Sequence, residues 1–138
     1  MKASLVKGLS TTRRFTVDKE KTIDFMGEAL RVYATPWMLK DMEMTCRDLI
    51  KPHLEEGQES VGLHVELDHT GASLLDSWVD ITATVTGVDD RRVSFAIEAR
   101  DPLDVVGKCD HVRFVIDSAR QKKRLESKAQ KLKEMGHE

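Results

Sequence analysis

The feature that most constrains the fold is a run of four segments, between residues 61 and 116, in which apolar and polar residues alternate. Successive side chains of a β-strand point to opposite faces, so a period of two predicts strands with one apolar and one polar face. Polar turns at 87–91 and 101–104 separate the last three segments, as expected of hairpin connections. The pattern favours an antiparallel sheet covered on one side. The residues expected to face the cover are Val61, Leu63, Val65 and Leu67, then Val79, Ile81, Ala83 and Val85, then Val93, Phe95, Ile97 and Ala99.

One long helix is predicted before these strands, from Pro36 to about Ile50. Thr35 is a suitable helix cap, proline suits the first helical position, and Pro52 marks the end. Apolar positions recur along it at helical spacing and form one broad stripe. Upstream, residues 15–18 alternate as a strand begins, and residues 21–34 indicate a short helical turn and a loop. A lone helix followed by a meander of amphipathic strands is best satisfied by a sheet wrapped around the helix, so we expect an α+β fold.

The 138 residues are enough for one domain, which we place at residues 1–117, followed by a charged helical tail at 118–138. The tail is rich in Lys, Arg and Glu, with only Leu125, Leu132 and Met135 as spaced large apolar residues. Its basic segment, residues 120–124, could contact a phosphate, but a solvated face is the favoured interpretation.

Composition excludes little but sets the broad class. A net charge of −2 gives no indication of binding to nucleic acid or to an anionic membrane. No apolar run approaches the roughly 20 residues of a spanning helix, and the first residues lack the apolar region of a signal peptide, so a cytoplasmic location is expected. Cys46 and Cys109 form no CxxC pair or zinc pattern and are expected to be buried, reduced thiols. We expect neither a metal nor a separate cofactor.

Candidate catalytic residues are polar side chains on faces that should be apolar, because burying them is costly unless they have a role. His69 continues the odd-numbered series of the second strand and is expected to point to the core side, whereas His64 shares the polar face. Glu43 lies at the edge of the helix stripe, although it could simply pair with Lys40 or Arg47. Thr35 would place a hydroxyl at the helix start. Each of the three, taken alone, also has a purely structural interpretation.

Together the three residues suggest attack on an acyl carbonyl. A helix packed on the apolar face of the sheet would let the carboxylate of Glu43 approach the imidazole of His69. The carboxylate could orient the ring, or act directly as nucleophile or base. The hydroxyl of Thr35 and the free N–H groups at the helix start could hold a developing oxyanion.

The order and spacing of these residues resemble those of the fluoroacetyl-CoA thioesterase family of hot-dog-fold proteins. The similarity covers roughly residues 12 to 118. It consists of Thr35 and Glu43 eight residues apart, the loop from Pro52 to Gly62, His69 within Leu-Asp-His-Thr-Gly-Ala-Ser, and the run that contains His111 and Arg113. The resemblance implies a hot-dog fold, a homodimer with active sites at the subunit interface, and hydrolysis of an acyl-CoA thioester, CoA being part of the substrate.

The resemblance also implies roles for single residues. Thr35, Glu43 and His69 match the family's catalytic threonine, glutamate and histidine, and Gly62 matches a glycine whose backbone N–H lies at the thioester carbonyl. His111 and Arg113 would be structural or lie near CoA, with a structural role favoured. In the fluoroacetate-specialised member, phenylalanines before the catalytic threonine help to form a lid. The stretch from Met26 to Leu30 contains none, which favours another short-chain acyl group.

Two other functions remain open at this stage. The first is a non-catalytic hot-dog module that binds an acyl group or CoA. The second is a hot-dog hydratase or dehydratase, which would also use a histidine and a carboxylate but normally carries a different signature.

Overall fold

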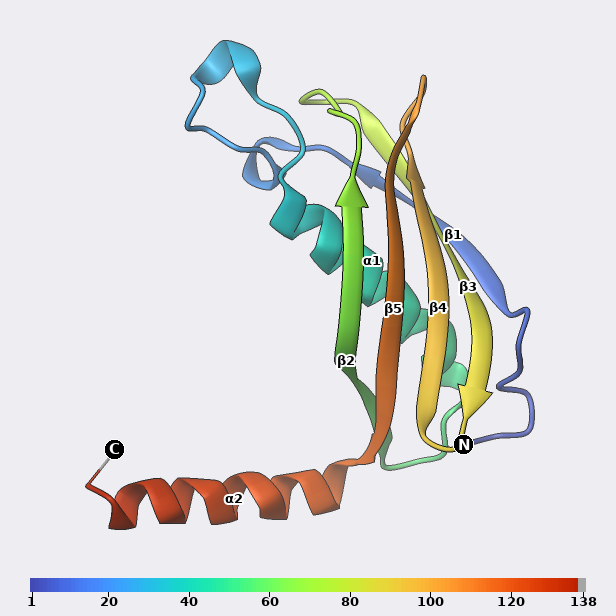
Figure 1. Ribbon diagram of the computed structural model, residues 1–138, viewed down its shortest axis with the longest axis vertical. Coiled ribbons are helices and arrows are strands. Elements are labelled where there is room, and N and C mark those ends of the chain that lie inside the picture. The colour runs from blue at the N-terminus through green and yellow to red at the C-terminus, as the bar shows by residue number, and fades with distance from the viewer. Residues whose placement is uncertain (137–138) are drawn as a thin grey trace.

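Residues 1–136 are described by a computed structural model, in which a five-stranded antiparallel sheet curves around one long helix (Figure 1). The strand order is β1-β3-β4-β5-β2, so β1 and β2 form the two edges of the sheet. The α+β arrangement expected from the sequence is confirmed. The strands are β1 Ser10–Thr16, β2 Gln58–His69, β3 Trp78–Asp89, β4 Arg92–Arg100 and β5 Val105–Asp117; the α-helices are α1 Thr35–Ile50 and α2 Ser118–Glu134; short 3-10 turns span Lys19–Lys21, Glu28–Leu30 and Lys51–His53.

The helix and strand boundaries follow the predicted ones closely, with one shift at the start of the chain. β1 begins at Ser10, five residues before the alternation at 15–18, and it ends at Thr16. The segment predicted as a short helical turn and a loop holds two 3-10 turns. α1 begins one residue earlier than predicted, at Thr35.

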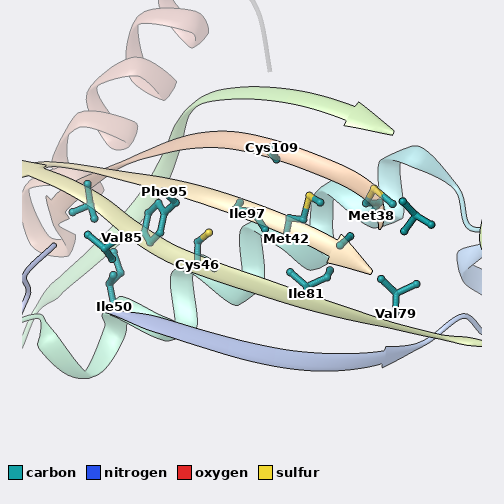
Figure 2. Close-up of a cluster of buried hydrophobic side chains, with 14 of the residues drawn as sticks. Met38, Met42, Cys46, Ile50, Val79, Ile81, Val85, Phe95, Ile97 and Cys109 are labelled. Carbon is teal, nitrogen blue, oxygen red and sulfur yellow. The ribbon is translucent and has the colours of Figure 1, made fainter. Parts of the chain in front are cut away.

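The core lies between α1 and the inner face of the sheet. Four side chains of the helix stripe, Met38, Met42, Cys46 and Ile50, are completely buried and face the apolar residues of β3 and β4 (Figure 2). Each such side chain contributes about 1.5–3 kcal/mol relative to an exposed position. All the residues predicted to line the inner face on β3 and β4 are buried, which confirms the alternation there.

β2 departs from the predicted alternation because of a β-bulge. Gly62 pairs with Arg113 and His64 pairs with Val112, so Leu63 is an extra residue with no partner on β5. The extra residue reverses which side chains face inward. The inner face of β2 is therefore made by residues 60 and 62 before the bulge and by residues 65, 67 and 69 after it, opposite the buried residues of β5.

The prediction that the first four apolar residues of β2 belong to the core is thus wrong for three of them. Val61 lies on the outer face, opposite Phe114, and is 40% exposed. Leu63 at the bulge and Val65 after it are 50% and 40% exposed, and only Leu67 is partly buried against the core. The free edge of the sheet at β2 is consequently apolar and uncovered in the single chain.

The helical tail leaves the sheet at the end of β5 and extends past the β2 edge (Figure 1). The carboxylate of Asp117 accepts hydrogen bonds from the backbone N–H groups of Ala119 and Arg120 and so caps α2. No residue of α2 is buried, in line with the solvated helix that was predicted. The final residues of the expected tail, 137 and 138, lie outside the described residues. Within residues 1–136, every helix is too short or too polar to span a bilayer.

Candidate active site

Thr35 and His69 meet at one end of the molecule. α1 and β2 run in opposite directions, which brings the first residue of the helix next to the last residue of the strand (Figure 1). The Thr35 Oγ1 atom lies 2.7 Å from His69 Nδ1, a hydrogen-bond distance. The prediction that Thr35 caps the helix is wrong, because Ala34 occupies the cap position and no side chain caps this end. The hydroxyl of Thr35 pairs with the imidazole instead.

The surroundings of His69 favour a neutral ring. Partial burial lowers the pKa of His69, while a hydrogen bond with the backbone of Gly71 opposes this effect. A neutral imidazole at this distance can accept the hydroxyl proton of Thr35 or a proton from a nearby water molecule. Tyr33 packs edge-on against the ring, with centroids 6.3 Å apart and planes at 71°. This contact restricts how the ring can rotate.

A buried polar group behind Tyr33 was missed by the sequence analysis. The hydroxyl of Tyr33 donates a hydrogen bond to Asp41, and Lys21 forms an ion pair with the same carboxylate at 3.0 Å. Asp41 is only 5% exposed, and burial is the main cause that raises the pKa of Tyr33. The available signal was the position of Asp41, three residues after Met38 and four before Thr45, which places an acid inside the buried stripe of α1.

An open hollow of about 510 Å³ lies beside the Thr35–His69 pair. Its lining combines these two polar side chains with apolar residues, among them Ile23, Val32 and Phe25. Phe25 is 79% exposed and comes directly before the stretch that has no phenylalanine. An aromatic side chain is therefore present at the hollow. It lies one residue before the stretch from Met26 to Leu30, which corresponds to the family's lid segment and contains no phenylalanine.

Glu43 and Gly62 form a second cluster, farther along α1. The inward direction of Gly62 follows from the bulge, and a Cβ placed on it would lie 3.0 Å from Glu43 Oε2. This close approach of the backbone to the carboxylate explains why the position suits glycine. Glu43 pairs with Arg113, at 3.7 Å between Oε2 and Nη1, and no ion pair within the described residues joins it to Lys40 or Arg47.

His111 and Arg113 of β5 form a buried hydrogen-bond network next to this second cluster. Both are nearly fully buried. Arg113 donates hydrogen bonds to the hydroxyl and the carbonyl of Ser60, at 2.8 and 2.9 Å, and its Nη1 lies 3.2 Å from His111 Nε2. His111 Nδ1 lies 2.7 Å from the carbonyl of His64. Burial lowers the pKa of His111, so a neutral ring donates to that carbonyl and accepts from Arg113. The favoured structural role of the two residues agrees with this geometry.

The two clusters are well separated within one chain. Thr35 and Glu43 are eight residues apart on a helix that rises about 1.5 Å per residue, so roughly 12 Å of helix axis lies between them. The structure therefore brings Thr35 to His69 and Glu43 to Gly62, but it does not bring the four residues together in one chain. Within residues 1–136, no three His, Cys, Asp or Glu side chains are grouped as a metal ion would require.

Solved structures with the same fold place the chain in a class. A thioesterase superfamily member from Thermus thermophilus matches with a TM-score of 0.84 and 28% identity, over 92% of this chain and 95% of that one. A hot-dog-like protein from Thermanaerovibrio acidaminovorans matches with a TM-score of 0.82 and 25% identity, over 88% and 91%. The chain is a hot-dog-fold protein of the thioesterase superfamily.

The family follows from closer relatives. The family of fluoroacetyl-CoA-specific thioesterases matches residues 17–119. The fluoroacetyl-CoA thioesterase of Streptantibioticus cattleyicolor is 32% identical over 123 residues, covering 84% of this chain and 88% of that protein. A solved fluoroacetyl-CoA thioesterase has a TM-score of 0.81 and 30% identity, over 88% of this chain and 96% of its own. The chain belongs to the fluoroacetyl-CoA-specific thioesterase family, and this membership makes it a thioester hydrolase, as the sequence indicated.

Proposed function

We propose that the protein hydrolyses a short-chain or small acyl-CoA thioester to the free acid and CoA, using Thr35, Glu43, His69 and Gly62. The observation that carries the proposal is the 2.7 Å contact between the Thr35 hydroxyl and the His69 imidazole beside an open hollow. Family membership supports the reaction class. The reaction needs water as its second reactant and no separate cofactor, since CoA is part of the substrate.

The steps of the reaction are divided between the residues of the two clusters. The neutral ring of His69 takes a proton from water as the water oxygen bonds to the carbonyl carbon, and later returns a proton to the departing thiolate when the C–S bond breaks. When Nδ1–H of His69 donates to Thr35 Oγ1, the Thr35 hydroxyl is free to donate its own hydrogen bond to the oxyanion, as does the N–H of Gly62. Glu43 either orients these groups or attacks first, forming a transient anhydride that water then hydrolyses.

The uncovered edge of the sheet supports a homodimer. Val61, Leu63 and Val65 are 40–50% exposed on β2, whose outer backbone groups have no strand beside them in the single chain. An exposed apolar edge strand pairs readily with another chain, and a second copy joined by a two-fold axis offers the same edge. α2 extends past this edge, toward the side on which the partner would lie (Figure 1).

A dimer of this kind would also bring one cluster of each protomer together with the other cluster of its partner. Each protomer carries both half-sites, about 12 Å apart along α1. A two-fold axis at β2 turns the partner's helix end for end, so that the Thr35–His69 pair of one protomer can complete a site with Glu43 and Gly62 of its partner. The active site would then be shared between subunits.

The acyl group is proposed to be small. Variants of the fluoroacetyl-CoA thioesterase have been solved with acetyl-CoA and with fluoroacetate and CoA, which are small acyl ligands. Phe25 lines the hollow and can cover such a group. Replacing Phe25 with alanine is expected to raise kcat/KM for longer acyl chains relative to acetyl-CoA, measured across a chain-length series. An unchanged ratio would show that Phe25 does not limit acyl size.

The main test is hydrolysis of a panel of acyl-CoAs, with the released thiol measured. His69→Ala and Glu43→Gln are each expected to lower kcat by about 10²–10⁴-fold. His64→Ala and Glu66→Gln are matched controls, because both residues lie on the exposed face of the same strand and should leave kcat unchanged. The proposal would be refuted if the wild type hydrolysed no acyl-CoA of any chain length, or if His69→Ala and Glu43→Gln kept full activity. Ligand-dependent stabilisation without turnover would instead support the binding module.

A cytoplasmic location is proposed on the basis of the two cysteines. Cys46 and Cys109 are free and buried, and burial raises the pKa of both thiols, that of Cys109 to about 11. Buried reduced thiols of this kind are common in reducing compartments.

A further inference from the structure

The arginines of this chain divide into two groups by their ion pairs. The chain has ten arginines, and six of them lie within 4 Å of a carboxylate: Arg13, Arg14, Arg31, Arg47, Arg100 and Arg113. Among residues 1–136, the other four make no such pair: Arg91, Arg92, Arg120 and Arg124. All four lie in one region, where the β3–β4 turn, the end of β5 and the start of α2 come together.

These residues surround a pocket of about 210 Å³ in the elbow between β5 and α2. Arg91, Arg120 and Arg124 line it, and Phe114 and Ile116 of the outer sheet face form its apolar side. Arg92 is the register partner of Phe114, so its side chain lies on the same outer face, next to the phenylalanine. The pocket thus joins several guanidinium groups to one aromatic ring.

The positive charge of this pocket is poorly balanced by the protein itself. The carboxylate that lines it, Asp117, is already used to cap α2. Asp89 and Asp90 come shortly before Arg91, but within the described residues neither forms an ion pair. The start of α2 next to the pocket, residues 118–125, carries Arg120, Lys122, Lys123 and Arg124 and contains no Asp or Glu. Like charges held this close favour an anionic ligand.

We propose that this pocket binds a phosphorylated purine nucleotide, and that in the enzyme reaction it holds the 3′-phospho-ADP end of acyl-CoA. Guanidinium groups bind phosphates through paired hydrogen bonds, and an aromatic ring offers a surface for a purine. Assigning the nucleotide to CoA rests on the proposed thioesterase function; binding of the nucleotide itself does not.

The position of the pocket fits a substrate that reaches the proposed site. Phe114 lies on the outer face of the sheet, and Glu43 and Gly62 meet on the inner face, but Asp117 of the pocket pairs with Gln58 at the start of β2, four residues before Gly62. A strand rises about 3.3 Å per residue, so the long pantetheine arm of CoA has roughly 13 Å to cover around the start of β2. α2 lies almost entirely beyond residues 17–119, so its arginines are additions to the part that matches the family.

The experiment uses the full-length double variant Arg120→Gln/Arg124→Gln. Both side chains are exposed and neither donates a hydrogen bond within the described residues, so the fold should be unaffected. The matched control is Lys131→Gln/Lys133→Gln, which removes the same charge two to three turns farther along α2 and outside the pocket. Steady-state kinetics are measured with acetyl-CoA and with acetyl-pantetheine, which lacks the nucleotide. Binding of 3′-phospho-ADP is measured separately by calorimetry.

The double variant is expected to raise KM for acetyl-CoA by about tenfold or more, with kcat unchanged and with no effect on acetyl-pantetheine. It should weaken 3′-phospho-ADP binding by a similar factor, and the control variant should do neither. Weaker nucleotide binding with an unchanged KM would assign the pocket to a free nucleotide rather than to the substrate. Unaltered nucleotide binding, or an equal loss in the control variant, would overturn the proposal. If the wild type hydrolysed neither thioester, the proposed function would fail, but calorimetry would still test the pocket.

Discussion

The proposed sharing of one active site between two subunits can be tested by mixing two inactive chains. One chain carries Thr35→Ala and the other carries Glu43→Gln. Each variant alone should lose about 10²–10⁴-fold in kcat, since every site of its dimer lacks one group. In a mixed dimer with shared sites, one site receives both substitutions and the other receives neither. Activity should therefore return when the two chains are combined.

The size of the recovery follows from the geometry. The roughly 12 Å between Thr35 and Glu43 along α1 exceeds what either side chain can bridge around one small acyl group, so the partner must supply the second residue. Random mixing of equal amounts gives half mixed dimers, each with one intact site of two, so about one quarter of the wild-type activity is expected. Mixed dimers isolated through two different affinity tags should show about half.

The assay is thiol release from acetyl-CoA after co-expression and tandem purification. The matched control mixes Thr35→Ala with His69→Ala, which lie in the same cluster, 2.7 Å apart. No mixed dimer of these two chains can contain an intact site, so this pair should remain inactive. If the Thr35→Ala and Glu43→Gln chains form mixed dimers that stay inactive, the shared site is refuted. A chain that sediments as a monomer at assay concentration would refute the dimer itself.

Three further outcomes test the site and its support. Burial lowers the pKa of His69 below its ordinary 6.5, so kcat/KM should fall as the pH decreases through a midpoint below 6.5; an acid limb centred above 6.5 would contradict a neutral base. Gly107→Ala would place a Cβ 2.6 Å from Met38 Sδ and should lower the free energy of unfolding by about 1–3 kcal/mol in urea titrations, whereas Gly87→Ala, with no atom within 4 Å, should have a much smaller effect. Asp41→Ala should cost about 3 kcal/mol, because it leaves a buried hydroxyl and a largely buried ammonium group without their partner; a loss below 1 kcal/mol would show that water replaces the carboxylate.

Much of the fold could be predicted from the sequence. β3 and β4 each have a strand on both sides, and there the alternation of apolar and polar residues correctly predicts which side chains are buried. The apolar face of β2 was predicted less well for two separate physical reasons. The bulge depends on backbone pairing with β5, which side-chain pattern does not encode, and so Val61 was assigned to the wrong face. Val65 does point inward, but it remains exposed because its edge of the sheet has no cover in one chain.

The candidate site was predicted in part. The inward direction of His69 was predicted from its odd position, and it holds because the bulge comes before Val65, so that Val65, Leu67 and His69 share the inner face. The pairing of Thr35 with His69 could not be foreseen, since a threonine before a proline normally indicates a cap. Asp41 was missed because its burial depends on partners far away in the sequence.

The bulge in β2 has a consequence for how the sequence can change over evolutionary time. Substitutions along the first half of the strand alter one side chain each. Deleting Leu63, by contrast, would restore an unbroken alternation, so the two halves of β2 could no longer both keep their present side chains on the inner face. Either His69 would turn away from Thr35, or Gly62 would turn away from Glu43. The length of this strand should therefore be under stronger purifying selection than the identity of most of its residues, and natural insertions or deletions should be confined to the loops at its two ends.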